Sequence, residues 1–152
     1  MSNVSLTNPS GDKQYAATLV RSQRITPPNS TEDVRHLVFR RDDPSFSCKT
    51  GQCVRVMAPG QYGNKYHPRL YLVADNDVER DGGVEFAICV KRHSYIDDFN
   101  GERYQGIASS YLCDLPVGAA VELTGPFGYP FEVPADRKSG ILMIGMGTGI
   151  AP

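Results

Sequence analysis

Alternating hydrophobic and polar residues predict six short β-strands separated by turn-forming residues. In the clearest segment, residues 84–91, Val84, Phe86, Ile88 and Val90 share one face, which we expect to meet the core. The other strands are predicted at Tyr15 to Ile25, Val34 to Arg40, Cys53 to Ala58, Arg69 to Ala74 and Ala119 to Thr124. Short strands at this spacing are typical of a small all-β antiparallel barrel or sandwich.

One short helix interrupts the β pattern. Ser110 to Leu115 can form a helix that begins with a cap at Ser109 or its neighbour and ends before Pro116. A single helix in an otherwise β chain suggests a specific role for that helix.

The last segment has a different pattern. Ile141 to Ile144 is a continuous apolar run, which predicts a buried parallel strand leading into the glycine-rich turn Gly145 to Gly149. Such a strand needs parallel neighbours from an α/β domain. We therefore divide the chain into a flexible N-terminus (1–12), a barrel domain (13–138) and the start of a truncated second domain (139–152). The missing half would follow in cis or lie on another chain.

Composition narrows the possible functions. The 152 residues suit one domain, and the net charge of -1 provides no overall field for nucleic acid or an anionic membrane. The polar N-terminus and the lack of a long apolar stretch predict neither a signal peptide nor a membrane span. We expect a cytoplasmic or stromal-type location.

The cysteines and histidines do not form a recognisable metal site. No C-x-x-C pair occurs, so we predict buried, reduced thiols and no metal. The residues are Cys48, Cys53, Cys89 and Cys113, with scattered His36, His67 and His93.

Two segments carry candidate ligand chemistry. Arg69 and Tyr71 share a strand face and could offer a phosphate-binding fork and a stacking ring, although an exposed Arg beside a half-buried Tyr has the same pattern. Gly106 to Ser110 could present a helix N-terminus to a pyrophosphate, or form an ordinary capped helix.

Five stretches occur together in a familiar order. They are Arg69-Leu70-Tyr71; Cys89-Val90-Lys91-Arg92 with Tyr95; Gly106-Ile107-Ala108-Ser109-Ser110-Tyr111-Leu112-Cys113-Asp114-Leu115; Thr124-Gly125-Pro126-Phe127-Gly128; and Gly147-Thr148-Gly149-Ile150-Ala151-Pro152. With them, most of the chain resembles the plant-type ferredoxin–NADP reductase family, including the benzoyl-CoA oxygenase reductase components.

The resemblance implies a six-stranded antiparallel Greek-key barrel that binds FAD. It places Tyr71 on the isoalloxazine and Arg69 at the pyrophosphate. It further implies cofactor contacts by Leu72, Val90, Lys91, Tyr95, Gly106, Ile107, Ala108, Ser109 and Thr148. Of these, Val90 and Lys91 would line the adenosine side, Tyr95 would stack on adenine, and Thr148 would belong to the loop that faces the nicotinamide.

One position departs from the family pattern. Leu72 stands where the family has a Ser or Thr whose hydroxyl hydrogen-bonds near flavin N5, and leucine has no donor. Hydride transfer could therefore be slowed, or Leu72 could shield N5 and favour one-electron transfer. Phe127, Tyr129 and Phe131, which recur with period two, are assigned to core packing.

The implied function is electron transfer between NAD(P)H and a ferredoxin-type carrier or an oxygenase component. NADPH and NADH remain alternatives, because the residues that distinguish them would lie in the absent half. A second hypothesis is a non-catalytic flavin-binding or interaction module, motivated by Leu72 and the missing nucleotide domain.

Overall fold

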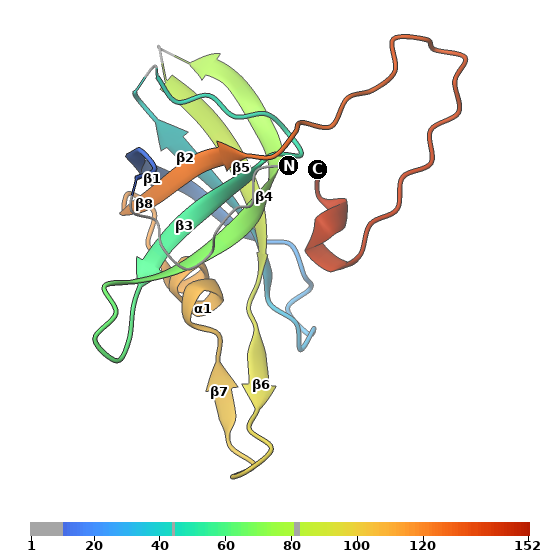
Figure 1. Ribbon diagram of the computed structural model, residues 1–152. Coiled ribbons are helices and arrows are strands. Elements are labelled where there is room, and N and C mark those ends of the chain that lie inside the picture. Colours follow the sequence, from blue (N-terminus) through green and yellow to red (C-terminus); the bar gives the residue numbers. More distant parts are fainter. Residues whose placement is uncertain (1–10, 44, 81–82) are drawn as a thin grey trace.

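The protein is built around a closed barrel of six antiparallel strands (Figure 1). A computed structural model describes residues 11–43, 45–80 and 83–152. The strands are β1 (Gln14–Arg24), β2 (Val34–Arg41), β3 (Cys53–Pro59), β4 (Tyr66–Arg80), β5 (Gly83–Lys91) and β8 (Ala120–Phe127). Their order around the barrel is β1-β2-β5-β4-β3-β8, and β2-β5-β4-β3 forms a Greek key. The predicted fold class is confirmed.

Three smaller elements complete the described chain. Strands β6 (Ser94–Ile96) and β7 (Arg103–Gln105) form a hairpin that projects beyond the barrel in Figure 1. Helix α1 (Ile107–Asp114) follows, and a short 3₁₀ helix, Gly147–Ile150, lies near the C-terminus. None of the helices in the described residues is long and apolar enough to cross a membrane.

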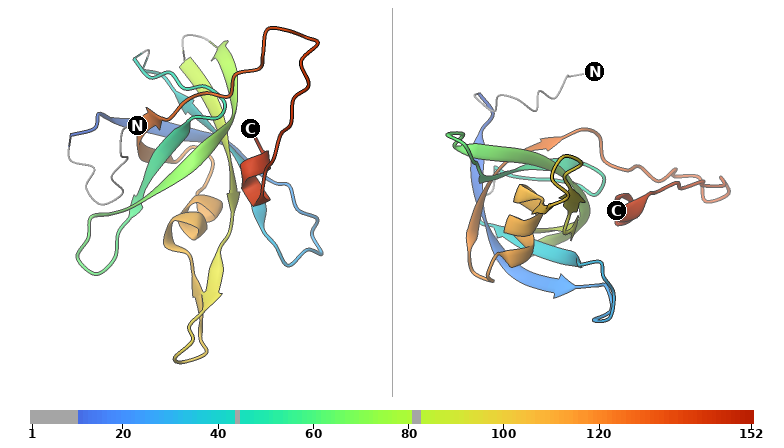
Figure 2. Two further views of the ribbon diagram at one scale, coloured as in Figure 1. Left: turned by 45° about the vertical axis from the view of Figure 1, so that its right-hand side comes forward. Right: turned by 90° about the horizontal axis from the view of Figure 1, so that it is seen from below.

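Helix α1 closes one end of the barrel. Seen from below in Figure 2, α1 lies within the ring of strands. Its buried residues Ala108, Ser109, Leu112 and Cys113 fall on one helical face, and Leu112 is fully buried. Because complete burial of a leucine stabilises a fold by about 1.5–3 kcal/mol, this contact fixes the helix firmly on the barrel.

Aromatic rings fill the middle of the core. Phe86 lies 5.7 Å from Phe39 and 5.6 Å from Phe46, measured between ring centroids, and all three rings are buried. The predicted inward face of β5 is confirmed for Phe86, Ile88 and Val90, which are at most 1% exposed. Val84, predicted on the same face, is only half-buried. On the other face Glu85 and Cys89 are half-buried and Lys91 is exposed, whereas the small Ala87 is buried as well.

The C-terminal segment differs from its prediction. Ile141 to Ile144 forms no strand, and these side chains are 55–89% exposed. A buried strand needs hydrogen-bonding neighbours, and the described residues contain no parallel strand to supply them. Tyr129 and Phe131 are also exposed, so their assignment to the core was wrong, whereas Phe127 is half-buried beneath Arg55.

One residue of the N-terminal segment predicted to be flexible contacts the barrel. Residues 1–10 of the segment predicted to be flexible lie outside the described residues. Asp12, however, accepts a 2.7 Å hydrogen bond from Nη1 of Arg55 in β3. This ion pair attaches Asp12 to the barrel.

Candidate functional site

A groove of about 980 Å³ opens at the end of the barrel that carries α1. It exists because β4 and β5 separate: their pairing stops at Val73 and Ile88, while the earlier half of β4 pairs with β3. The first half of β4, the end of β5, the β6–β7 hairpin and the start of α1 line the resulting space.

Most residues predicted to bind the cofactor line this groove. They are Arg69, Tyr71, Lys91, Tyr95, Gly106, Ile107, Ala108, Ser109 and Thr148. Leu72 and Val90 are not brought to its wall. Val90 alternates with the groove-lining Cys89 and Lys91 along β5. Val90 is buried in the core, and Leu72 is half-buried opposite Cys53.

Tyr71 and Arg69 share the face of β4 that meets the groove. Tyr71 is half-buried against the core, and burial, followed by the nearby Cys113, raises its pKa to about 12 despite the opposing effect of Arg69. Its phenol therefore stays protonated at neutral pH. Arg69 is exposed, and its Nη1 donates a 2.8 Å hydrogen bond to the carbonyl of Pro68.

The N-terminus of α1 opens onto the groove without a side-chain cap. The helix begins at Ile107 after Gly106, three residues earlier than predicted, so the predicted cap at Ser109 was wrong. Instead, Oγ of Ser109 accepts a 3.1 Å hydrogen bond from the backbone N–H of His93 and donates to the carbonyl of Gly106 at 3.3 Å. With no acidic side chain in its first turn, this helix end favours an anionic ligand.

The β6–β7 hairpin contributes an aromatic pair, of which the sequence predicted Tyr95 but not Tyr104. Tyr95 pairs with Tyr104 across the hairpin, and their rings stack with centroids 5.6 Å apart and an interplanar angle of 24°. The signal was available, because Asn100-Gly101 is a strong hairpin turn sequence. Tyr104, Tyr62, His67 and His93 line the groove without having been predicted there.

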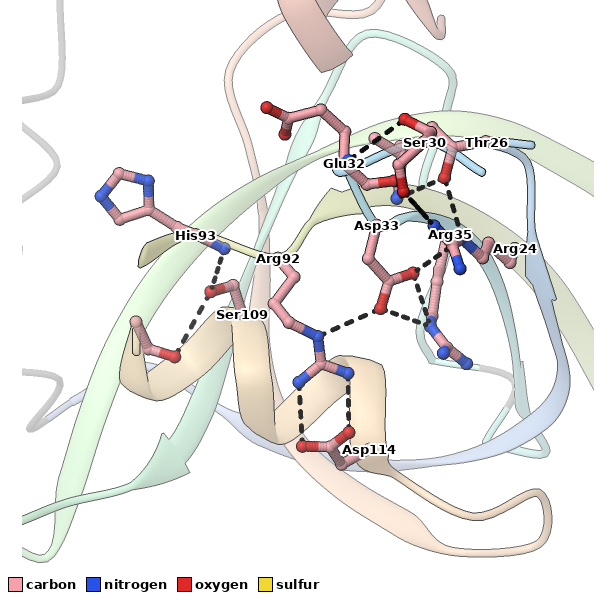
Figure 3. A network of polar contacts seen from close by, with 12 residues as sticks. Arg24, Thr26, Ser30, Glu32, Asp33, Arg35, Arg92, His93, Ser109 and Asp114 are labelled. Atoms are coloured by element: carbon pink, nitrogen blue, oxygen red, sulfur yellow. Dashed lines mark hydrogen bonds and ion pairs between the residues drawn. The ribbon is translucent and has the colours of Figure 1, made fainter. Parts of the chain in front are cut away.

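Lys91, the last residue of β5, and Arg92, which follows it, have different charged partners. Lys91 lines the groove and forms a 2.7 Å ion pair with Glu32. Arg92 instead joins Asp33 and Asp114 (Figure 3). Its Nε donates to Asp33 at 3.0 Å, and its two terminal nitrogens bind both carboxylate oxygens of Asp114 at 3.0 and 2.6 Å.

This network explains the protonation of its members. Burial raises the pKa of Asp33, but hydrogen bonds from Arg92 and Arg35 lower it more, so the net shift is downward. The hydrogen bond from Arg92 also lowers the pKa of Asp114. Both carboxylates therefore stay charged at neutral pH, and the network links the end of β5, the start of β2 and the C-terminal end of α1.

The cysteines are all free thiols. Burial raises the pKa of Cys48 to about 12, and burial is also the first cause that raises the pKa of Cys113 to about 11. Across the described part of the chain, no three His, Cys, Asp or Glu side chains gather as a possible metal site.

The fold and the matching sequence establish the class of protein. Residues 21–131 match the family model for the oxidoreductase FAD-binding domain, and the chain belongs to this family. FAD is therefore the cofactor of the domain.

Particular relatives are ferredoxin–NADP reductases. The chloroplastic enzyme of Spinacia oleracea is 36% identical over 141 residues, which cover 91% of this chain and 38% of the relative. A Picosynechococcus reductase is 36% identical over 126 residues, 78% of this chain and 31% of the relative. The chain thus spans less than two-fifths of the length of these relatives.

Solved structures support the same fold. The ferredoxin–NADP⁺ reductase of Plasmodium falciparum with 2′P-AMP aligns with a TM-score of 0.70 and 23% identity, covering 91% of this chain and 49% of that chain. At this identity the match concerns the fold.

The groove fits the chemical parts of FAD. It offers aromatic rings from β4 and from the hairpin, cationic side chains at Arg69 and Lys91, and an uncapped helix end. A Cβ atom at Gly106 would lie only 2.7 Å from Oγ of Ser109, so glycine keeps the approach to the helix uncrowded.

Proposed function

We propose that this FAD-binding domain serves a reductase that transfers electrons between NAD(P)H and a ferredoxin-type carrier or an oxygenase component. The observation that carries the proposal is one groove combining stacking rings, cations and a helix N-terminus in a barrel of this family. The relatives named above are ferredoxin–NADP reductases, which makes NADP and ferredoxin the leading partners. By analogy with the plant relatives, a stromal or cytoplasmic setting suits this function.

Each part of the cofactor has candidate partners in the groove. Tyr71 supports the isoalloxazine ring with its half-buried phenol, which stays protonated. Arg69 and the N–H groups at the start of α1 hold the pyrophosphate. Lys91 lies on the adenosine side, and Tyr95, stacked on Tyr104, supports the adenine.

When bound, FAD supplies the redox chemistry, because its flavin ring can accept a hydride and release electrons one at a time. The protein's own contribution is to bind and orient the ring. Leu72 offers no hydroxyl for a hydrogen bond, and its side chain does not line the groove. This residue favours the second candidate function, a flavin-binding module that nicotinamide cofactors do not reduce.

The C-terminal segment supports a division of labour between domains. We propose that residues 139–152 begin an NAD(P)-binding domain, in cis or on another chain, and that 13–138 form the flavin barrel. The exposed apolar run Ile141 to Ile144 and the position of Thr148 on the groove wall support this division.

Cofactor titration tests the binding step first. The purified chain should quench FAD fluorescence and give a saturable isotherm by calorimetry; absence of binding would refute the groove assignment. The full protein, or this chain with an NAD(P)-binding domain supplied, should then show bleaching of flavin absorbance by NADPH or NADH. Binding without reduction would select the second candidate.

Leu72 can be tested directly in the same completed protein. Because Leu72 does not line the groove, flavin should be reduced at the wild-type rate in both Leu72→Ser and Leu72→Ala. Faster reduction in Leu72→Ser alone would show that a hydroxyl at this position reaches the flavin. Equal rates in all three proteins would eliminate the hydroxyl argument.

A further inference from the structure

Tyr62 is an exposed aromatic residue with an unusual backbone conformation. It lies in the loop between β3 and β4, lines the groove and is 99% exposed. Its φ of 54° falls in the left-handed region, which residues with a Cβ atom rarely adopt. Among the described residues, Tyr62 alone combines a side chain with a positive φ.

The loop itself fixes this conformation. The backbone N–H of Gly60 donates to the carbonyl of Lys65 at 3.0 Å, and that of Asn64 donates to Gln61 at 3.1 Å. A Cβ atom at Gly60 would lie 2.1 Å from the carbonyl oxygen of Asn64, so the loop closes too tightly for any other residue there. The ring of Tyr62 gains no burial in return for its strained backbone, which points to a contact made outside the domain's own packing.

Tyr62 in the β3–β4 loop and Tyr95 in the hairpin line the same groove. Beyond the last pair, Val73 and Ile88, the antiparallel strands β4 and β5 separate. One wall of the groove runs back along β4 to the Tyr62 loop, and the other runs forward from β5 to Tyr95. In Figures 1 and 2 the β3–β4 loop and the hairpin lie at the same end of the barrel, near α1.

We propose that Tyr62 stacks on the adenine end of the bound dinucleotide, facing the Tyr95–Tyr104 pair. A ligand that begins at Tyr71 and follows β4 reaches the Tyr62 loop at its far end. A planar base between two aromatic surfaces gains stacking on both faces. The inference rests on the proposed placement of FAD in this groove, and it makes Tyr62 a determinant of selectivity for FAD over FMN.

Binding measurements on the purified chain test this role. Tyr62→Ala should weaken binding of FAD and ADP about tenfold, the effect expected for one lost aromatic–base stack, and leave FMN binding unchanged. Tyr62→Phe should retain wild-type affinity because it keeps the ring. Tyr129→Ala is the matched control, since Tyr129 is 90% exposed but does not line the groove. The melting temperature should be the same in all four proteins.

The outcomes separate the two proposals. If wild type binds FAD and Tyr62→Ala binds it equally well, the role of Tyr62 is refuted and the proposed function stands. Equal weakening of FMN and FAD would refute the assignment to adenine. If wild type binds neither FAD nor ADP, both proposals fail together.

Discussion

The two ends of α1 differ in their side-chain partners. At the N-terminal end no side chain caps the helix, and Gly106 leaves the first turn facing the groove. At the C-terminal end Arg92 binds both carboxylate oxygens of Asp114, and thereby ties the helix to Asp33. An end that the protein completes itself contributes stability, whereas an end left open is available to a ligand.

The charge of Asp114 makes this contrast sharper. A carboxylate at the C-terminus of a helix is unfavourable with the helix dipole, and α1 has no basic residue of its own in its last turn. Arg92, supplied by the chain after β5, offsets that charge. Variants at the C-terminal end should therefore change stability, and variants at the groove end should change ligand binding.

The largest effect on stability is expected at Leu112, because this residue fixes the whole of α1 on the barrel. Leu112 is fully buried between α1 and the barrel, so Leu112→Ala should lower the free energy of unfolding by about 2–5 kcal/mol. Chemical denaturation would measure the loss. Val117→Ala, at an exposed position just after α1, should have almost no effect. A loss below about 1 kcal/mol for Leu112→Ala would show that α1 is not fixed by this contact.

At the groove end, Arg69→Gln should reduce FAD affinity without changing stability. A hydrogen bond to a charged group contributes about 1.5–3 kcal/mol, which corresponds to roughly 10- to 100-fold in the dissociation constant. Arg69 is exposed, so the melting temperature of the free protein should not move. Arg103→Gln, an exposed arginine on β7 away from the groove wall, serves as the control. Equal affinities for both variants would contradict a pyrophosphate at Arg69.

At the opposite end, Arg92→Gln should cost about 1–2 kcal/mol of stability. Most of the loss should come from Asp33, because Asp114 is 68% exposed and its pair is screened by solvent. Because Arg92 does not line the groove, FAD affinity should fall only if the loss of this network displaces or unfolds α1. Arg35→Gln, which removes a hydrogen bond to Asp33 but none to Asp114, should have a smaller effect.

The same variant changes the response to acid. The pKa values of Asp33 and Asp114 are lowered in the folded state, so their contribution to stability is present above the ordinary value near 3.8 and is lost as pH falls through the folded-state values. Stability of the wild type should therefore decline on acidification below about pH 4. Arg92→Gln should show a flatter decline; an unchanged slope would mean that the network does not lower these pKa values.

The sequence predicted best those features of the fold that depend only on local residue patterns. Period-two alternation placed all six barrel strands, and burial of Phe86, Ile88 and Val90 followed from the same pattern. The strand expected at Ile141 to Ile144 is absent because its formation depends on neighbours rather than on its own residues. A continuous apolar run records that a segment can be buried, but not what would cover it.

The groove was predictable only in part, for a related reason. Arg69 and Tyr71 could be placed on one face from strand geometry alone. Tyr62 and Tyr104 reach the groove through a loop and a hairpin whose courses depend on turn geometry. The start of α1 was misplaced because the hydroxyl of Ser109, which suggested a cap, instead bonds to the backbone of His93.

Ser109 gives the smallest predicted effect, because it lines the groove yet directs its hydroxyl toward the protein. Ser109→Ala should cost about 1 kcal/mol of stability, since it removes the acceptor of the His93 N–H. FAD affinity should change by less than about threefold, or 0.6 kcal/mol. Ser110→Ala is the control: the buried Oγ of Ser110 has no hydrogen-bond partner in the described structure, so its removal should be neutral or stabilising. If Ser109→Ala instead weakened FAD binding tenfold at unchanged stability, the hydroxyl would bind the ligand directly. The ligand site at the start of α1 would then include this side chain as well as the backbone N–H groups.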